Sequence, residues 1–128
     1  MTIEDFGGRH EVNSIAEFEA ILRSRYGPGV NGVWLSHTNE RHPAISLLVK
    51  GDLATLHYFP QEDHPGFRSV GRMDSLNRNE FGLFNLDTVE QETEIWNATV
   101  VPIREAISAV RDFFRSNELP ISIEWSEL

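Results

Sequence analysis

The sequence contains no cysteine among its 128 residues. This absence excludes a disulfide scaffold, a cysteine nucleophile and any thiolate metal site. No apolar run approaches the roughly 20 residues that a membrane-spanning helix needs. The N-terminus, MTIEDFGGRHEV, has no basic start followed by an apolar segment. We therefore expect a cytoplasmic protein with no signal peptide and no membrane partner.

Basic residues are scarce. The chain has 11 Lys and Arg against 20 Asp and Glu, a net charge of −9 and a pI of about 4.9. Affinity for phosphate comes from Lys and Arg, so direct binding of nucleic acid is disfavoured. A basic protein partner is favoured by the same Coulomb argument, mainly through the association rate. Acidity also serves solubility in many cytosolic proteins, so charge alone does not identify a partner.

Recognisable catalytic motifs are missing as well. The sequence has no Gly-x-Ser-x-Gly elbow, and Gly7–Gly8 and Gly27–Gly29 lack the spacing of phosphate-binding loops. The histidines do not follow a familiar zinc signature. They are His10, His37, His42, His57 and His64. We expect a protein that is not an enzyme, with no cofactor and no metal.

The clearest structural signal present is AISLLVK-GD-LATLHYF, residues 44–59. Gly51-Asp52 is a two-residue turn signal between two runs of strand-forming residues, which predicts a β-hairpin. Its register gives one apolar face with the pairs Ile45/Tyr58, Leu47/Leu56 and Val49/Ala54. The opposite face is mixed, with the pairs Ala44/Phe59, Ser46/His57, Leu48/Thr55 and Lys50/Leu53.

Two helices are expected beside this hairpin. Ser14 and Glu17 form a capping box before a helix over 15–26, which Gly27 and Pro28 end. Pro102, as the first helical residue, precedes an apolar stripe at helical spacing. That stripe is Ile103, Ala106, Ile107, Val110, Phe113 and Phe114.

The remaining segments favour short strands after a loose start. The expected strands cover 9–12, 33–37, 67–72, 80–86, 93–100 and 121–125. The sequence therefore predicts a single α+β domain over 1–128, with a mostly antiparallel sheet and two helices packed on one face. The other face of the sheet would be only partly covered, and we expect a partner to bind there.

Acidic and aromatic residues suggest how a partner would bind. Glu90, Glu92 and Glu94 are two apart, so in an extended segment they point the same way. A charged strand edge that prevents aggregation would show the same pattern. Glu62 and Asp63 form a second acidic group, in a loop beside Phe59 and Phe67. The candidate partner-binding residues are Phe59, Glu62, Asp63, Phe67, Glu90, Glu92 and Glu94.

An alternative uses the polar residues near the hairpin differently. His57, Asp63 and His64 could line the pocket of a small ligand-binding or hydrolytic α+β domain. Convergence of these three side chains in one cleft would favour this alternative.

Several motifs together resemble a known family. VPIREAISAVRDFFRSNELPISIEW, residues 101–125, has a proline-started helix, then a proline and a strand ending in Trp. The elements that carry the likeness are Pro102, Ala106, Phe114, Pro120 and Trp125. VKGDLATLHYFP (49–60) and HPGFRSVG (64–71) resemble the middle segment of the same family. From about Val33 onward the chain is similar to the Imm1 immunity proteins of bacterial polymorphic toxin systems.

The resemblance implies a non-catalytic cytoplasmic protein used in interbacterial competition. It would bind a cognate toxin domain in a 1:1 heterodimer and occlude the toxin's active site. Many toxins inhibited by such proteins are nucleic-acid deaminases, so the resemblance implies a basic partner that acts on DNA or cytidine. An acidic protein would compete with phosphate for the basic cleft of that partner.

Overall fold

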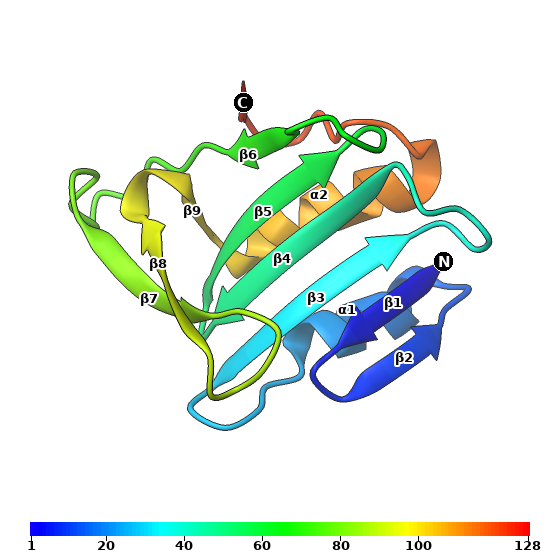
Figure 1. Ribbon diagram of the computed structural model, residues 1–128, viewed down its shortest axis with the longest axis horizontal. Helices are drawn as coiled ribbons and strands as arrows, with labels where there is room; N and C mark the ends of the chain where they lie inside the picture. Colours follow the sequence, from blue (N-terminus) through cyan, green and yellow to red (C-terminus); the bar gives the residue numbers. More distant parts are fainter.

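The computed structural model describes residues 1–128 as an antiparallel sheet with two helices on one face and a separate hairpin on the other (Figure 1). The main sheet has the order β10-β6-β5-β4-β3-β1-β2, and β9 also pairs with β5. Its strands are β1 (Thr2–Asp5), β2 (Gly8–Glu11), β3 (Val30–Ser36), β4 (Ala44–Lys50), β5 (Leu53–Phe59), β6 (Phe67–Ser69), β9 (Val100–Pro102) and β10 (Trp125–Glu127). The helices are α1 (Ile15–Arg23) and α2 (Ile103–Ser116), and the separate hairpin is β7 (Phe81–Asn85) with β8 (Glu92–Trp96). The predicted α+β class is confirmed.

The central hairpin has the predicted register at every position. Ala44 pairs with Phe59 and Lys50 pairs with Leu53, with all five intervening pairs as expected. Gly51 opens the turn with a φ of +56°, a conformation that glycine adopts without steric cost. Alternation along two β-rich strands and a two-residue turn were sufficient to define this part of the sheet.

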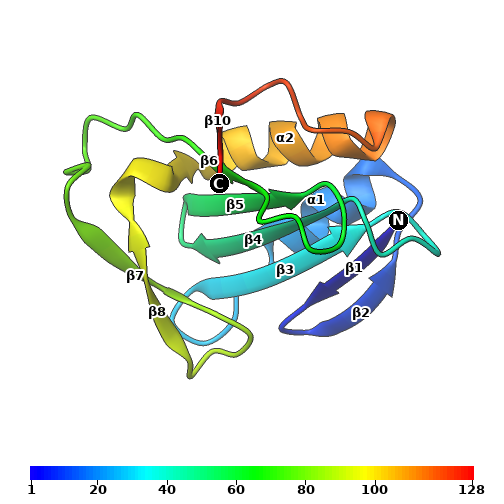
Figure 2. The same cartoon turned by 45° about the horizontal axis from the view of Figure 1, so that its top comes forward.

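The apolar face of this hairpin packs on both helices. Ile45, Leu47 and Leu56 are fully buried in a cluster that also contains Phe18 of α1 and Phe113 of α2. Figure 2 shows α2 running along β5 on this side of the sheet. The predicted stripe of α2 is confirmed, but Pro102 lies one position before the helix and ends β9 instead of beginning α2. Neither helix is long and apolar enough to span a membrane.

Helix α1 begins as predicted and ends three residues early. The Glu17 amide donates to Ser14 Oγ (3.2 Å), which caps the first turn. At the other end Ser24 is extended, with φ −69° and ψ 139°. The Arg25 guanidinium then donates to the carbonyl oxygens of Leu22 and Gly51, which ties the chain to the turn of the central hairpin. The helix therefore ends before Gly27, where Arg25 bonds both to the last helical turn and to the Gly51 carbonyl oxygen of the central hairpin.

The N-terminal segment is not loose, contrary to expectation. Strands β1 and β2 form a hairpin, and β1 pairs with β3, so both extend the main sheet. The Ile3 side chain is fully buried, and the Met1 ammonium donates to the Val12 carbonyl oxygen (2.9 Å). Strand β3 starts at Val30, three residues before the predicted start, within what was expected to be a turn.

The predicted closing strand over 121–125 is wrong. Ile121 is 94% exposed, and the strand β10 begins only at Trp125 and pairs with β6. The Ser122 amide donates to Asp112 Oδ2 of α2, and Trp125 Nε1 donates to the Pro120 carbonyl oxygen. These bonds fold the segment back on itself, so the alternating pattern does not become a strand.

Strand boundaries also differ between β6 and β9. The strand predicted over 67–72 ends at Ser69, whose hydroxyl accepts from the Leu56 amide and donates to the Thr99 carbonyl oxygen. The strand predicted over 93–100 is interrupted by a 3-10 turn over Asn97–Thr99. That turn carries the chain from the separate hairpin back to the main sheet, where β9 pairs with β5.

The β7–β8 hairpin partly covers the side of the sheet that faces away from the helices, which we call the open face (Figures 1 and 2). Phe84 of β7 and Ile95 of β8 pack on Leu48 and Val100 of the main sheet. This second, smaller core holds the hairpin over one end of β3 and β4. The prediction that this face is only partly covered is confirmed, and the covering element is the β7–β8 hairpin.

Candidate functional site

A row of aligned side chains crosses the open face. Cross-strand partners in an antiparallel sheet share a face, so one row of register partners gives the residues that lie side by side. The register joins β2, β1, β3, β4, β5 and β6 in turn. The row is Arg9, Glu4, Trp34, Ser46, His57 and Arg68.

An aromatic group lies at the centre of this face. The rings of His57 and Phe59 stack with centroids 4.0 Å apart, and Trp34 stacks on Phe59 at 5.4 Å. Trp34 is 39% exposed, although its neighbours Val33 and Leu35 are buried. Strand β3 thus alternates as usual between buried and exposed residues, but its outward residue is an aromatic indole where a polar side chain is usual. These three stacked rings form a partly solvent-exposed aromatic cluster, which we call the aromatic platform.

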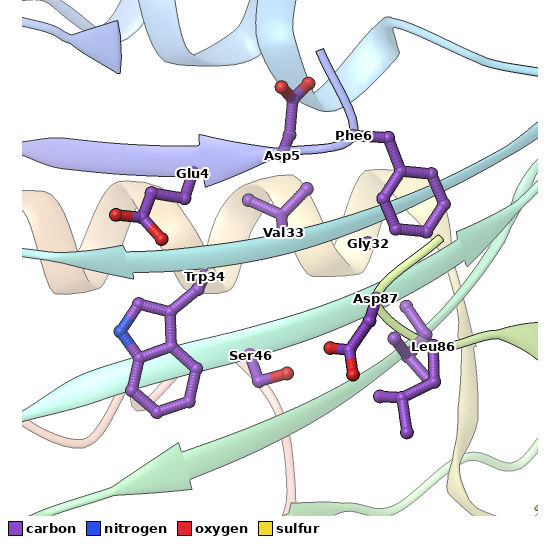
Figure 3. Close-up of a pocket in the computed structure, with 10 residues that line it drawn as sticks. Glu4, Asp5, Phe6, Gly32, Val33, Trp34, Ser46, Leu86 and Asp87 are labelled. Atoms are coloured by element: carbon purple, nitrogen blue, oxygen red, sulfur yellow. The ribbon is translucent and has the colours of Figure 1, made fainter. Parts of the chain in front are cut away.

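A groove separates this platform from the β7–β8 hairpin. It has a volume of about 360 Å³, and His57, Arg68 and Leu86 are among its lining residues. A smaller hollow of about 190 Å³ continues from it around Trp34, toward Glu4 and Asp87. Figure 3 shows Asp87 reaching from the hairpin over β4 beside Ser46, with Glu4 projecting from β1 next to Trp34. Carboxylates therefore lie at one end of the groove and a guanidinium at the other.

Burial lowers the pKa values of two basic side chains in the groove, His57 and Arg68. The pKa of His57 is lowered from 6.5 because burial disfavours the imidazolium; the hydrogen bond to Pro65 opposes this, and the charge of Arg68 adds to it. His57 Nε2 donates to the Pro65 carbonyl oxygen (2.7 Å), so Nε2 carries the proton of the neutral ring. Burial also lowers the pKa of Arg68, which nonetheless stays charged. At neutral pH the positive charge in the groove is that of Arg68.

The outer face of the β7–β8 hairpin is a second unusual surface. Phe81 pairs with Trp96 and Leu83 pairs with Glu94, and these side chains point away from the main sheet. The Phe81 and Trp96 rings are in contact, with centroids 3.8 Å apart. Phe81, Leu83 and Trp34 were not among the contact residues predicted from the sequence. Once Phe84 is placed inward, period-two alternation along β7 puts Phe81 and Leu83 outward.

The structure brings two of the three predicted glutamates together. Glu92 and Glu94 lie on one face of β8 and are exposed, as the two-residue spacing implies. Glu90 is also exposed but lies before the strand, in the turn that joins β7 to β8. All three carboxylates belong to the hairpin and not to the main sheet.

The other predicted residues lie near the far end of β5. Phe59 belongs to the aromatic platform, and Glu62 and Asp63 are exposed in the loop that follows it. Phe67 pairs with Tyr58, so its ring lies on the helix-facing side and packs on the main core. The structure thus places Phe59 and Phe67 on opposite faces of the sheet.

The three residues of the alternative do not converge. His57 lies on the open face, whereas His64 stacks on Phe67 and its Nδ1 accepts from the Gly66 amide (2.8 Å). The groove beside His57 is not lined by Asp63 or His64. No group of three or more His, Asp or Glu side chains is placed to hold a metal ion.

Comparison with known proteins gives one informative similarity. No protein-family model matches the chain. The chain is 23% identical over 131 residues to the double-stranded DNA deaminase immunity protein of Burkholderia cenocepacia (strain H111), and the match covers 100% of both chains. This full-length similarity supports a relationship to immunity proteins and does not single out the Imm1 family.

Proposed function

We propose that this chain is an immunity protein that binds a cognate deaminase toxin and inhibits it by covering the toxin's active site. The observation that carries the proposal is the full-length similarity to a double-stranded DNA deaminase immunity protein. The match spans both chains from end to end, so the similarity extends over the whole sequence and is not confined to a local motif.

The charge of the chain suits such a partner. A deaminase that acts on nucleic acid must accept phosphates and reach an exposed base, which requires a basic cleft. With a net charge of −9 the chain is attracted to that cleft and competes there with the phosphates of the substrate. The proposed inhibition therefore requires binding alone and no reaction by the immunity protein.

The open side of the molecule offers the surface for this contact. The aromatic platform supplies apolar area through Phe59, and acidic residues lie on both sides of it. Glu62 and Asp63 lie in the loop after β5, and Glu90, Glu92 and Glu94 lie on the β7–β8 hairpin. Phe67 would act from the helix-facing side by supporting that loop. Aromatic anchors within an acidic rim are suited to a standard interface of roughly 1,600 Å² in a 1:1 complex.

Co-expression tests the proposal directly. The toxin domain encoded beside the gene for this chain is expressed in bacteria with and without the chain. We expect toxin-dependent killing without the chain, survival with it, and co-purification of the two proteins as a 1:1 complex. Unchanged killing together with separate elution of the two proteins would refute the proposal.

An activity assay then locates the inhibition. The purified toxin domain is assayed on single- and double-stranded DNA and on RNA, with increasing amounts of the chain. Stoichiometric loss of deamination supports occlusion of the active site. If the complex forms but the bound toxin still deaminates its substrate, inhibition by occlusion of the active site is disproved.

A further inference from the structure

The outer face of the β7–β8 hairpin exposes more apolar surface than its folding requires. Phe81 is 47% exposed, Leu83 45% and Trp96 49%, and all three lie on one face of a two-stranded sheet. Isolated exposed apolar residues are common, whereas a contiguous group that includes two aromatic rings marks an interaction site. Tryptophan is also among the residues most enriched in the energetically dominant parts of interfaces.

The hairpin is held in place without these residues. Its inward face supplies Phe84 and Ile95 to the second core. Lys50 Nζ donates to the Leu83 carbonyl oxygen (3.0 Å), a backbone contact that does not need the Leu83 side chain. The Asn97 amide donates to the Glu80 carbonyl oxygen (3.0 Å) and closes the open end of the hairpin. The outward side chains are therefore not needed to attach the hairpin and are available for binding.

Charge identifies the kind of molecule that would cover this face. Residues 81–96 contain Asp87, Glu90, Glu92 and Glu94 and no Lys, Arg or His. Glu92 and Glu94 share the outward face of β8 with Trp96. A second copy of the chain would oppose these carboxylates with identical ones, and like charges at close range are unfavourable. Nucleic acid would be repelled for the same reason, so the matching surface is a basic protein with an apolar pocket.

We propose that the outer face of the β7–β8 hairpin is the principal docking surface for the toxin, with the Phe81–Trp96 ring pair as its anchor. This inference rests on the proposed function and adds the contact that carries most of the affinity. The ring pair enters an apolar pocket of the toxin, and Glu92 and Glu94 pair with Lys or Arg at the rim of that pocket. The groove and its aromatic platform lie on the other side of the hairpin and contribute less.

Two alanine variants test the anchor. The dissociation constant for the neighbouring toxin domain, inactivated for safe handling, is measured by titration calorimetry or interferometry. Trp96→Ala and Phe81→Ala are each expected to weaken binding by about 30-fold or more, as for residues at the centre of an interface. Ile121→Ala is the control, because Ile121 is an exposed apolar residue whose neighbour Ser122 is hydrogen-bonded to Asp112 of α2, on the side of the sheet away from the hairpin. It should bind as the parent does.

A charge reversal tests the rim. Glu94→Lys is compared with Glu118→Lys, which changes the net charge by the same amount at an exposed site just after α2. Glu94→Lys should weaken binding by about 10-fold or more, whereas Glu118→Lys should show only the small common effect of net charge. Equal losses in the two variants would show that overall charge, and not this face, guides the toxin.

The outcomes separate this inference from the proposed function. Failure of the parent protein to bind or protect would refute the function itself. Binding by the parent together with parent-like binding by Trp96→Ala and Phe81→Ala would overturn the docking surface alone, especially if Trp34→Ala lost affinity. Urea unfolding of each variant shows whether the fold is intact. A parent dimer that Trp96→Ala dissociates, without any effect on toxin binding, would also overturn the proposal.

Discussion

At the scale of single residues, the burial of His57 determines its charge. The ring stacks on Phe59 and donates to the Pro65 carbonyl oxygen, so both its face and its Nε2 are occupied. Arg68 is its register partner on β6, and the positive charge of Arg68 disfavours protonation of the His57 ring. The imidazole therefore acts as a neutral aromatic surface at neutral pH.

The lowered pKa of His57 predicts a pH dependence of stability. Below about pH 6.5 the unfolded chain takes up a proton at His57 that the folded chain does not. The free energy of unfolding therefore decreases as the pH is lowered through this range. The urea midpoint should therefore drop more for the parent than for His57→Gln between about pH 7.5 and pH 5.5. Parallel pH profiles for the two proteins would contradict this role of His57.

Gly71 is required by the close approach of another strand. A Cβ atom at this position would lie 1.7 Å from the carbonyl oxygen of Val100, which is backbone in β9 and cannot move aside alone. Gly71→Ala should destabilise the protein by about 3 kcal/mol, as other overpacking substitutions do. Urea denaturation at neutral pH provides the measurement.

Gly82 provides the matched control for this substitution. A Cβ atom there would meet Asn97 Oδ1 at 3.4 Å and Phe84 Cε1 at 3.8 Å, which are ordinary contacts. Gly82→Ala should therefore change the free energy of unfolding by less than about 1 kcal/mol. Similar losses at the two glycines would argue against the steric explanation.

At the scale of elements, the β7–β8 hairpin has one face in a core and one face in solvent. Phe84 and Phe81 lie on the same strand, three residues apart, yet Phe84 is buried and Phe81 is half exposed. The same residue type thus serves folding at one position and is available for binding at the other. The strand period of two places them on opposite faces.

A pair of substitutions separates these two roles. Phe84→Ala should lower the free energy of unfolding by about 3 kcal/mol, because it empties the second core. Phe81→Ala removes only a cross-strand ring contact and should lower it by no more than about 1 kcal/mol. Chemical denaturation of both variants checks the difference, and a larger loss at Phe81 would contradict the assignment of faces.

The elements that the sequence predicted well are those with strong local patterns. The central hairpin and α2 each bury a regular apolar face, so their periodicity is complete. The segment 121–125 has the same alternation but does not form a strand, since Ser122 and Trp125 hydrogen-bond to Asp112 and Pro120 instead. Strand β1 was missed because Ile3 is its only buried residue, so the segment has no alternating apolar pattern. Its partner β3 determines its conformation.

At the scale of the whole molecule, the charge of −9 acts at long range. The carboxylates of the hairpin and of the β5–β6 loop lie on both sides of the aromatic platform. Fields of this kind mainly accelerate the encounter with a basic partner, and salt screens them within about 10 Å at 0.1 M.

This predicts a salt dependence confined to association. Raising the salt from about 0.05 M to about 0.5 M should slow association with the proposed toxin partner by about tenfold and leave the dissociation rate within about twofold. Interferometry at several salt concentrations resolves the two rates. A salt effect carried mainly by dissociation would indicate buried ion pairs in place of steering.

The sequence by itself determined the fold class, the register of the central hairpin, the apolar stripe of α2 and the acidity of the chain. These properties follow from local periodicity, turn chemistry and composition. The tertiary structure alone decided which side chains share a surface. It placed Phe59 and Phe67 on opposite faces, turned Trp34 outward, and set Phe81 and Trp96 side by side. Those relations depend on strand pairing across long stretches of chain, which no local pattern encodes.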